Sequence, residues 1–384
     1  MTVLRVPKAS ISSPSWTSRS TTGEDCTFEQ LAPYIGRIKT SMARSLIERF
    51  TSPGDVVVDP FAGSGVIPFE AALLGRRTVA TDTNPYGVLL TRAKFSAPAD
   101  CDTALARFEI RWKRAQRRIR KQDLRKVPDW VRKFFHPETL RKALALRDEL
   151  VEESDSFLLA CLLGILHHQR PGFLSYPSSH LVPYLRDKLF PSRTFPELYE
   201  ERDIKVRMEA KIKRTYRRPP LALGRATIYS GDARFLPQPR RIDAIITSPP
   251  YMNELDYVRD NRLRLWFLAR ALPSVQDICR RDRETHFRSL LRDTFARLLG
   301  TLAPNASVIL VVGDTNRGSR RVDAAQSVRA LFAEHAFRSF VPRGEIRDRI
   351  PDIRRSRRDL TGTKKETILR YCFAAADSDR RRSR

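Results

Sequence analysis

The sequence lacks any run of about 18 apolar residues, the length that a helix needs to span a membrane. Its longest apolar segment, residues 157–166, is shorter, and we interpret it as a buried helix. Cysteine is scarce too, because the 384 residues include only five cysteines and no Cys-x-x-Cys pair. We therefore expect no membrane span, no disulfide framework and no structural zinc site, and a location in the reducing cytoplasm.

Acidic residues are few relative to basic ones. The 71 Lys and Arg residues outnumber the 44 Asp and Glu residues, which gives a formal net charge of +27 at pH 7. Such an excess favours polyanions, and nucleic acid is the partner that we expect. An acidic membrane surface is the alternative, and a GC-rich genome also produces arginine-rich proteins. Hydrophobic residues still make up 41% of the chain, which is enough for a folded core.

Strand-like and helix-like segments alternate between two tails. Residues 1–22 are rich in Ser and Thr and predict a disordered arm, whereas residues 377–384 predict a disordered basic tail. Short apolar segments separated by helices predict an α/β fold with a doubly wound, mostly parallel sheet. We expect strands at residues 56–59, 78–82, 226–229, 243–247, 307–312, 338–341 and 367–373, the last two as an antiparallel pair.

Residues 98–220 interrupt this alternation. They are densely basic at their start, and apolar residues recur at helical spacing within 137–151 and 157–167, so we expect a largely helical insertion. Basic side chains that contact phosphates would make nucleic-acid binding strongly dependent on salt. The candidate contact residues are Arg117, Arg118, Arg120 and Lys121 in the insertion and Arg259 outside it, and residues 347–358 are a second candidate segment.

A glycine-containing turn follows the first predicted strand. It reads Asp59-Pro60-Phe61-Ala62-Gly63-Ser64-Gly65 and precedes a helix, and Asp82 ends the next predicted strand. Glycines let the backbone approach a ligand closely, and an acid at this point of a doubly wound fold accepts hydrogen bonds from ribose hydroxyls. The third glycine of a dinucleotide site and a Gly-Lys-Ser/Thr phosphate loop are both missing. We therefore expect a nucleoside ligand without a pyrophosphate.

A second unusual turn follows the strand at 243–247. It reads Thr247-Ser248-Pro249-Pro250-Tyr251. The two prolines fix φ and remove two N–H donors, so carbonyl oxygens remain as acceptors beside a hydroxyl and an aromatic ring. Such a turn suits a flat group that carries an amine, although an ordinary Pro-Pro turn after a strand is the simpler alternative.

The two turns together resemble the signature motifs of S-adenosylmethionine-dependent DNA amino-methyltransferases, which methylate N4 of cytosine or N6 of adenine. The resemblance extends over residues 23–97 and 221–376 and implies a seven-stranded, Rossmann-like methyltransferase sheet. It implies S-adenosylmethionine as the cofactor and double-stranded DNA as the substrate. The insertion 98–220 departs from the family's usual arrangements, and as the only spare segment it is the candidate region for DNA binding and target recognition. The family motifs assign the cofactor to Tyr34, Gly36, Asp59, Pro60, Phe61, Ala62, Gly63, Ser64, Gly65, Asp82, Asn84 and Asp232.

The resemblance also implies the catalytic residues Ser248, Pro249, Pro250 and Tyr251. The Ser248 hydroxyl and the Pro249 carbonyl would accept the two N–H bonds of the amine and so free its lone pair, while Tyr251 would stack on the flipped base. Ser-Pro-Pro-Tyr favours cytosine N4. Adenine N6 methylation, RNA base N-methylation and a catalytically silent nucleic-acid-binding protein stay open as alternatives.

Two further chemistries are disfavoured by the sequence. Methylation of cytosine C5 requires a thiolate that attacks the ring, normally from a Pro-Cys pair, and none of the five cysteines follows a proline. The histidines His167, His168 and His180 lack the spacing of a metal site, so we expect no metal. We identify no nuclease motif, and any restriction activity would have to come from a separate cognate endonuclease.

Overall fold

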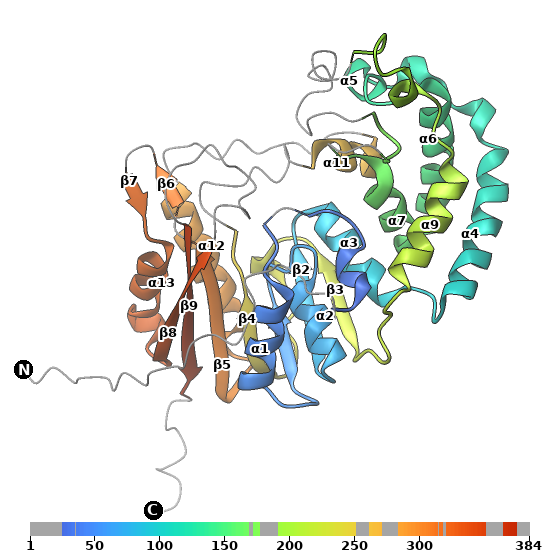
Figure 1. The fold of residues 1–384 in the computed structure, drawn as a ribbon. Helices are drawn as coiled ribbons and strands as arrows, with labels where there is room; N and C mark the ends of the chain where they lie inside the picture. Colours follow the sequence, from blue (N-terminus) through green and yellow to red (C-terminus); the bar gives the residue numbers. More distant parts are fainter. Residues whose placement is uncertain are drawn as a thin grey trace, which may run out of the picture.

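The computed structural model describes residues 25–34, 36–168, 172–176, 191–250, 261–270, 283–313, 315–317, 320–350 and 364–374. Seven strands form one sheet in the order β3-β2-β1-β4-β5-β9-β8 (Figure 1). β1, β2, β3, β4 and β5 run parallel, and β9 and β8 add an antiparallel edge. The strands are β1 Val56–Asp59, β2 Arg77–Asp82, β3 Ala226–Ser230, β4 Ile242–Thr247, β5 Leu302–Gly313, β8 Phe340–Ile350 and β9 Lys364–Phe373. The predicted α/β fold class is confirmed.

Alternate residues of the central strands face two different cores, because successive side chains of a strand point to opposite faces. Val57 of β1 packs with α1 (Thr40–Phe50) and α2 (Val66–Leu73) on one face. Val56 and Val58 pack on the other face with α12 (Arg283–Leu299) and α13 (Ala324–Phe332). β1 is therefore buried on both faces, which explains its uninterrupted apolar sequence.

The strand order reverses between β1 and β4. The chain passes from β1 outward through β2 to β3, and then returns to the other side of β1 with β4 and β5. Loops that leave the carboxyl ends of β1 and β4 therefore diverge to opposite sides, and ligands of doubly wound folds bind at this point. Both turns singled out in the sequence follow these two strands.

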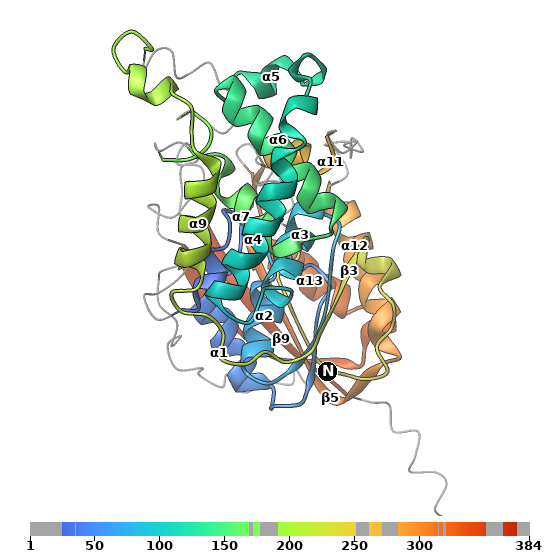
Figure 2. The ribbon, with the colours of Figure 1, turned by 90° about the vertical axis from the view of Figure 1, so that its right-hand side faces the viewer.

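The insertion lies between α3 (Pro85–Phe95) and β3, and its described residues are largely helical. Its helices are α4 Cys101–Gln116, α5 Asp129–Arg132, α6 Pro137–Glu152, α7 Ser156–Leu166 and α9 Ile204–Thr215, with short 3-10 helices at η2 Ile119–Lys121, η3 Leu124–Lys126 and η5 Pro196–Tyr199. Figure 2 shows the longer helices side by side. Every residue of 157–166 is buried, as predicted for this apolar segment. The core of the insertion is continuous with α3.

Several elements were not expected from the sequence. A hairpin of β6 (Thr315–Arg317) and β7 (Arg320–Val322) follows β5, and β8 extends to Ile350, well past the predicted end of that strand at 341. The helix expected after the Pro-Pro turn is α11, Arg262–Ala269, and residues 251–260 lie outside the described residues. The remaining elements are 3-10 helices at η1 Thr27–Gln30, η6 Ala233–Phe235 and η7 His335–Phe337. In the part of the chain that the structure describes, no helix is long and apolar enough to cross a membrane.

Candidate active site

The glycine turn, residues 59–65, bends sharply between β1 and α2. Gly63 and Gly65 have φ values of 53° and 74°, in the left-handed region that favours glycine. A Cβ on Gly65 would lie 2.5 Å from the Thr91 Oγ1. The clash requires glycine at position 65, where the turn lies against helix α3, and the φ of Gly63 favours glycine there.

Asp82 holds the glycine turn from the end of β2. Its carboxylate accepts hydrogen bonds from the Gly63 N–H and from the Asn84 N–H, both at 2.7 Å. Burial raises the pKa of Asp82, and the backbone donors act in the opposite direction. Each carboxylate oxygen can accept a second hydrogen bond, so the acid retains capacity for a ligand hydroxyl.

Asp59 joins the glycine turn to the second turn. Its Oδ1 accepts a hydrogen bond from the Thr247 hydroxyl at 2.6 Å and another from the Phe61 N–H at 3.1 Å. Burial raises the pKa of Asp59 to about 7. β1 and β4 pair directly, so this contact fixes the carboxyl ends of the two strands together at the point where the strand order reverses.

The second turn, residues 247–250, presents acceptor atoms. The Ser248 hydroxyl donates to the Val311 carbonyl of β5 at 3.1 Å. Because the hydroxyl proton is used in this bond, the oxygen offers lone pairs to an incoming N–H group. Pro249 is buried and Pro250 half-buried, and the predicted stacking residue Tyr251 lies outside the described residues.

The N-terminal segment, which includes Glu29, Pro33 and Tyr34, lies against the glycine turn. The Asn84 side-chain amide donates to the Tyr34 hydroxyl at 3.3 Å, and a Cβ on Gly63 would lie 3.4 Å from the Tyr34 ring. The Tyr86 hydroxyl donates to the Pro33 carbonyl at 2.8 Å. Gly36 has a φ of 80°, whereas residue 35 lies outside the described residues. Two of the residues predicted to bind the cofactor, Tyr34 and Asn84, are therefore in contact.

Helix α3 supports the glycine turn through residues that sequence reasoning missed. The Thr91 hydroxyl donates to the Gly63 carbonyl at 3.2 Å, and the buried Lys94 ammonium donates to the Gly65 carbonyl at 3.3 Å. A Cβ on Gly87 would lie 2.6 Å from the Gly63 carbonyl oxygen. Positions 87, 91 and 94 share one helix face, and this spacing is the signal that could have identified them.

Lys94 is held in turn by a buried acid. Its ammonium lies 3.0 Å from the Glu29 carboxylate, which belongs to the N-terminal segment. Burial lowers the pKa of Lys94, and the Glu29 carboxylate counteracts this effect. The ion pair therefore fixes the N-terminal segment, α3 and the glycine turn to one another.

Asp232 has a different environment from the two other acids. It precedes η6 and accepts hydrogen bonds from the Arg234 N–H at 2.9 Å and from the Arg234 guanidinium at 2.6 Å. Arg234 lowers the pKa of Asp232. The Gly231 N–H donates to the Asp82 carbonyl at 3.0 Å, so Asp232 lies beside the end of β2. Its contact with an adenine amine stays a prediction.

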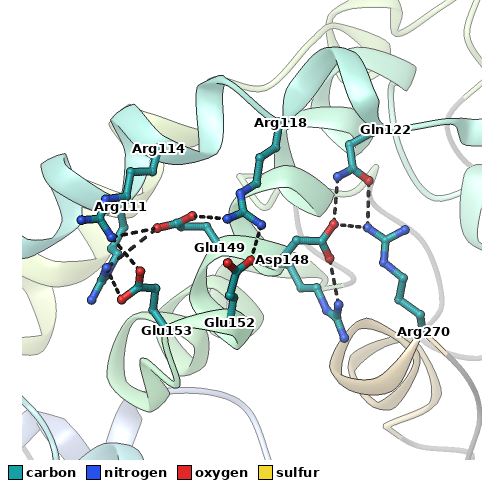
Figure 3. Close-up of polar contacts among 10 residues, drawn as sticks. Arg111, Arg114, Arg118, Gln122, Asp148, Glu149, Glu152, Glu153 and Arg270 are labelled. Carbon is teal, nitrogen blue, oxygen red and sulfur yellow. Dashed lines mark hydrogen bonds and ion pairs between the residues drawn. The ribbon is translucent and has the colours of Figure 1, made fainter.

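The predicted phosphate-binding residues divide into two groups. Arg118 forms ion pairs with Glu149 at 3.1 Å and Glu152 at 2.5 Å on α6 (Figure 3). Arg117, Arg120 and Lys121 are exposed where α4 ends and η2 follows, and Arg259 lies outside the described residues. Arg118 is therefore committed to the insertion itself, whereas its three neighbours are accessible.

The turn residues fit the nucleoside cofactor that the resemblance implies. Ser64 is buried, and within the described residues its Oγ has no hydrogen-bond partner. The chain thus offers a hydroxyl without a partner beside the backbone of Gly63 and the acid Asp82. For metal ions, the described part of the chain contains no group of three or more His, Cys, Asp or Glu side chains that could hold one.

Comparisons with known proteins bear on the N-terminal part of the chain. Residues 16–91 match the family model of the N6/N4 methyltransferases, described as DNA methylase. The matched segment contains Tyr34, the glycine turn and Asp82, so the match confirms the resemblance that these motifs indicated and supports S-adenosylmethionine as the cofactor. It also supports methyl transfer as the general activity. No curated protein matches the sequence.

Solved structures resemble the chain only distantly. TrmN from Thermus thermophilus has 14% sequence identity and a TM-score of 0.35, over 90% of this chain and 52% of TrmN. The rRNA methyltransferase AviRa from Streptomyces viridochromogenes has 12% identity and a TM-score of 0.33, over 92% and 95% of the two chains. A S-adenosylmethionine-dependent methyltransferase from Methanosarcina mazei has 8% identity and a TM-score of 0.37, over 86% and 98%. The chain spans about half the length of TrmN. The fold assignment rests on the strand order of this chain.

Proposed function

We propose that the chain transfers a methyl group from S-adenosylmethionine to the exocyclic amine of a base in double-stranded DNA, with cytosine N4 as the favoured target. One observation carries the proposal. The hydrogen bond of 2.6 Å between the Thr247 hydroxyl and Asp59 joins the two turns at the reversal of the strand order. A cofactor on the first turn and an amine on the second would therefore meet.

The cofactor side consists of the glycine turn and two neighbours. The backbone around Gly63 allows close approach, the second lone pairs of Asp82 suit ribose hydroxyls, and the Ser64 hydroxyl needs a partner. Tyr34 lies against the same turn. When bound, the cofactor supplies an electrophilic methyl group on a sulfonium centre.

The amine side consists of Ser248 and Pro249. The lone pair of an exocyclic amine is delocalised into the base, so the nitrogen is a poor nucleophile. Acceptors for both N–H bonds allow the nitrogen to become pyramidal, and these hydrogen bonds strengthen as positive charge develops on it. The Ser248 oxygen suits this role because its own proton points to Val311.

The substrate must present a base outside the stack. An amine within a duplex cannot reach the second turn, so the base has to flip out of the helix. The exposed residues Arg117, Arg120 and Lys121 are the candidate contacts for the flanking phosphates. A partner endonuclease, in a restriction-modification system, remains a separate expectation from the sequence.

Product analysis tests the proposal. The purified chain is incubated with methyl-labelled S-adenosylmethionine and either duplex DNA or structured RNA, and the digested nucleosides are separated by mass spectrometry. We expect N4-methylcytosine from DNA. N6-methyladenine would correct the base, label found only in RNA would overturn the DNA assignment, and unlabelled polymers despite cofactor binding would overturn the activity.

A further inference from the structure

Helix α11 depends on the rest of the protein for its stability. It has only eight residues, Arg262–Ala269, and a helix of this length is not stable alone in water. Leu263, Leu265, Trp266 and Phe267 are all buried, in the core that the insertion shares with α3. α11 contacts α3, α6 and α7, so the insertion provides much of the surface on which it forms.

Arg264 fixes α11 to the end of α7. The side chain is 6% exposed, and its guanidinium donates to the Leu163 carbonyl at 3.2 Å and to the His167 carbonyl at 2.7 Å. The last carbonyls of a helix lack intrahelical partners and form the negative end of its dipole. A buried cation at that end is therefore held in place by α7.

The same arginine reaches the cofactor side of the candidate active site. Its Cζ lies 5.9 Å from the centre of the Tyr86 ring, and the ring centres of Tyr86 and Tyr34 are 5.9 Å apart. Tyr86 also donates to the Pro33 carbonyl. Arg264 thus links the insertion to the segment that lies against the glycine turn.

Arg147 of α6 fixes the other end of α11. Its Nε donates to the Phe267 carbonyl at 2.5 Å, and its Nη2 donates to the Leu268 carbonyl. The side chain is nearly buried, and its remaining nitrogen pairs with Asp148 at 2.8 Å. One arginine of the insertion therefore satisfies two carbonyls at the C-terminal end of α11.

Arg270, the residue after α11, is held in a strained conformation. Its φ of 52° lies in the left-handed region, which costs a residue with a Cβ about 1 kcal/mol. The guanidinium contacts Asp148 at 2.5 Å and Gln122 at 2.8 Å, both in the insertion (Figure 3). Strain of this kind persists only where surrounding contacts maintain it.

We propose that Arg147 and Arg264 are positioning residues through which the insertion holds α11, the first described helix after Ser248-Pro249-Pro250. The insertion therefore serves catalysis by ordering the active-site side of the sheet, in addition to any contact that it makes with nucleic acid. The expected effect on methyl transfer rests on the proposed function, whereas the claim that the insertion holds α11 does not.

The test compares Arg147→Met with Arg111→Met in the full-length chain. Arg111 of α4 pairs with Glu153, the residue after α6, at 2.7 Å, and in the described part of the chain its ion pairs lie within the insertion and not with α11. Hydrogen exchange of residues 262–269 is measured by mass spectrometry, together with the single-turnover methylation rate, the affinity for S-adenosylmethionine and the melting temperature. Together they distinguish an effect on the position of α11 from a general loss of stability, which would lower the melting temperature in both variants.

For Arg147→Met we expect exchange in α11 to accelerate about 10-fold or more and the single-turnover rate to fall about 10-fold, with cofactor affinity within about twofold. Arg111→Met should leave α11 exchange and the rate within about twofold of the wild type. Equal effects of the two variants, or a rate that falls only as much as cofactor affinity, would overturn the proposal.

A second variant covers the case in which Arg147→Met does not fold. Arg270→Gly relieves the backbone strain but removes the contact with Asp148. If the insertion holds α11 through such contacts, exchange in α11 accelerates; if α11 exchange is unchanged or slows, the proposal is wrong. Hydrogen exchange is measured without substrate. If the wild-type chain methylates nothing, the proposed function is contradicted, but the exchange data still show whether the insertion holds α11.

Discussion

The carboxyl edge of the sheet and the helical insertion use acidic residues in opposite ways. At the edge, Asp59 and Asp82 accept hydrogen bonds from backbone N–H groups and a threonine hydroxyl. In the insertion, the buried Glu149 lies within 4 Å of the arginines Arg111, Arg114 and Arg118. Uncharged donors orient the first pair of acids, whereas three cations neutralise the buried acid of the insertion.

The difference shows which charges are available to a ligand. Acids held by neutral donors keep spare lone pairs for a ligand, whereas burial raises their pKa and so favours the protonated form. Arginines paired with glutamates produce little net positive potential, because the neighbouring carboxylate cancels their field. The number of basic residues in residues 98–126 therefore overstates how many are available to a polyanion, and the exposed residues Arg117, Arg120 and Lys121 remain the candidate contacts.

The largest expected effect is at the second turn. Ser248→Ala removes an acceptor for the amine, and we expect the methylation rate to fall about 100-fold, by analogy with the loss of a transition-state hydrogen bond. Single-turnover kinetics measure the rate, and DNA affinity by filter binding should stay within about twofold of the wild type. Full activity in this variant would contradict the proposed activation of the amine.

Removal of the central acid of the insertion tests the other side of the comparison. Glu149→Ala leaves Arg111, Arg114 and Arg118 without their shared partner, and we expect a loss of about 2 kcal/mol in the free energy of unfolding, less than for a fully buried pair because the arginines reach solvent. Urea denaturation measures the change. Glu152→Ala, whose side chain is 63% exposed, is the control and should cost less than about 1 kcal/mol.

Asp82→Ala should weaken cofactor binding about 10-fold, because a charged acceptor for ribose is lost and two backbone N–H groups lose their partner. Isothermal titration with S-adenosylmethionine measures the affinity. Asp243→Ala is a matched control, since Asp243 also accepts a backbone N–H, that of Val56 at 3.0 Å, but at the amino end of the strands. A loss of affinity in both variants would indicate a general effect on the sheet.

The raised pKa of Asp59 predicts a pH dependence of stability. Folding favours the protonated form, so the contribution of this group is complete below its ordinary pKa near 3.8 and is lost as the pH rises through about 7. Between pH 6 and pH 8 we expect the wild type to lose about 1 kcal/mol from this group. Thermal melts of the wild type and Asp59→Asn measure the effect, and equal pH profiles would show that Asp59 does not titrate in this range.

The smallest effect concerns the exposed arginines. Arg117→Ala should weaken DNA binding about threefold and lower the slope of log K against log salt concentration by about 0.9. Arg118→Ala should leave that slope unchanged, because Arg118 already pairs with Glu149 and Glu152. Titrations at several salt concentrations compare the two. An equal loss of slope would mean that the ion pairs open when DNA binds.

The local sequence predicted much of the fold and of the candidate site. Buried parallel strands are continuously apolar, so Val56–Asp59 and Ile242–Thr247 were located within a residue or two. The bend at Gly63 and Gly65 and the place of Asp82 at the end of a strand were predicted because both are local features, while the role of these residues in cofactor binding stays a prediction. A feature that depends only on residues close together in the chain can be predicted from the pattern of those residues.

Contacts between distant segments could not be predicted in this way. The bond between Thr247 and Asp59 joins residues that are 188 positions apart, and it exists only because β1 and β4 pair. The commitment of Arg118 to α6 likewise depends on how two helices pack, and the sequence showed only a basic segment. The hairpin of β6 and β7 lacked an apolar alternation that would have revealed it.

The position at which the insertion leaves the sheet has a geometric consequence. The Tyr216 hydroxyl bonds the Pro98 carbonyl at 2.6 Å, so the two ends of the insertion meet, and α4 then extends from this base for 16 residues, or about 24 Å. If DNA is the substrate, the length of α4 consequently sets the distance between Arg117 and the second turn, residues 247–250. One helical turn more or less would change that distance by about 5.4 Å, which is between one and two base-pair steps of about 3.4 Å.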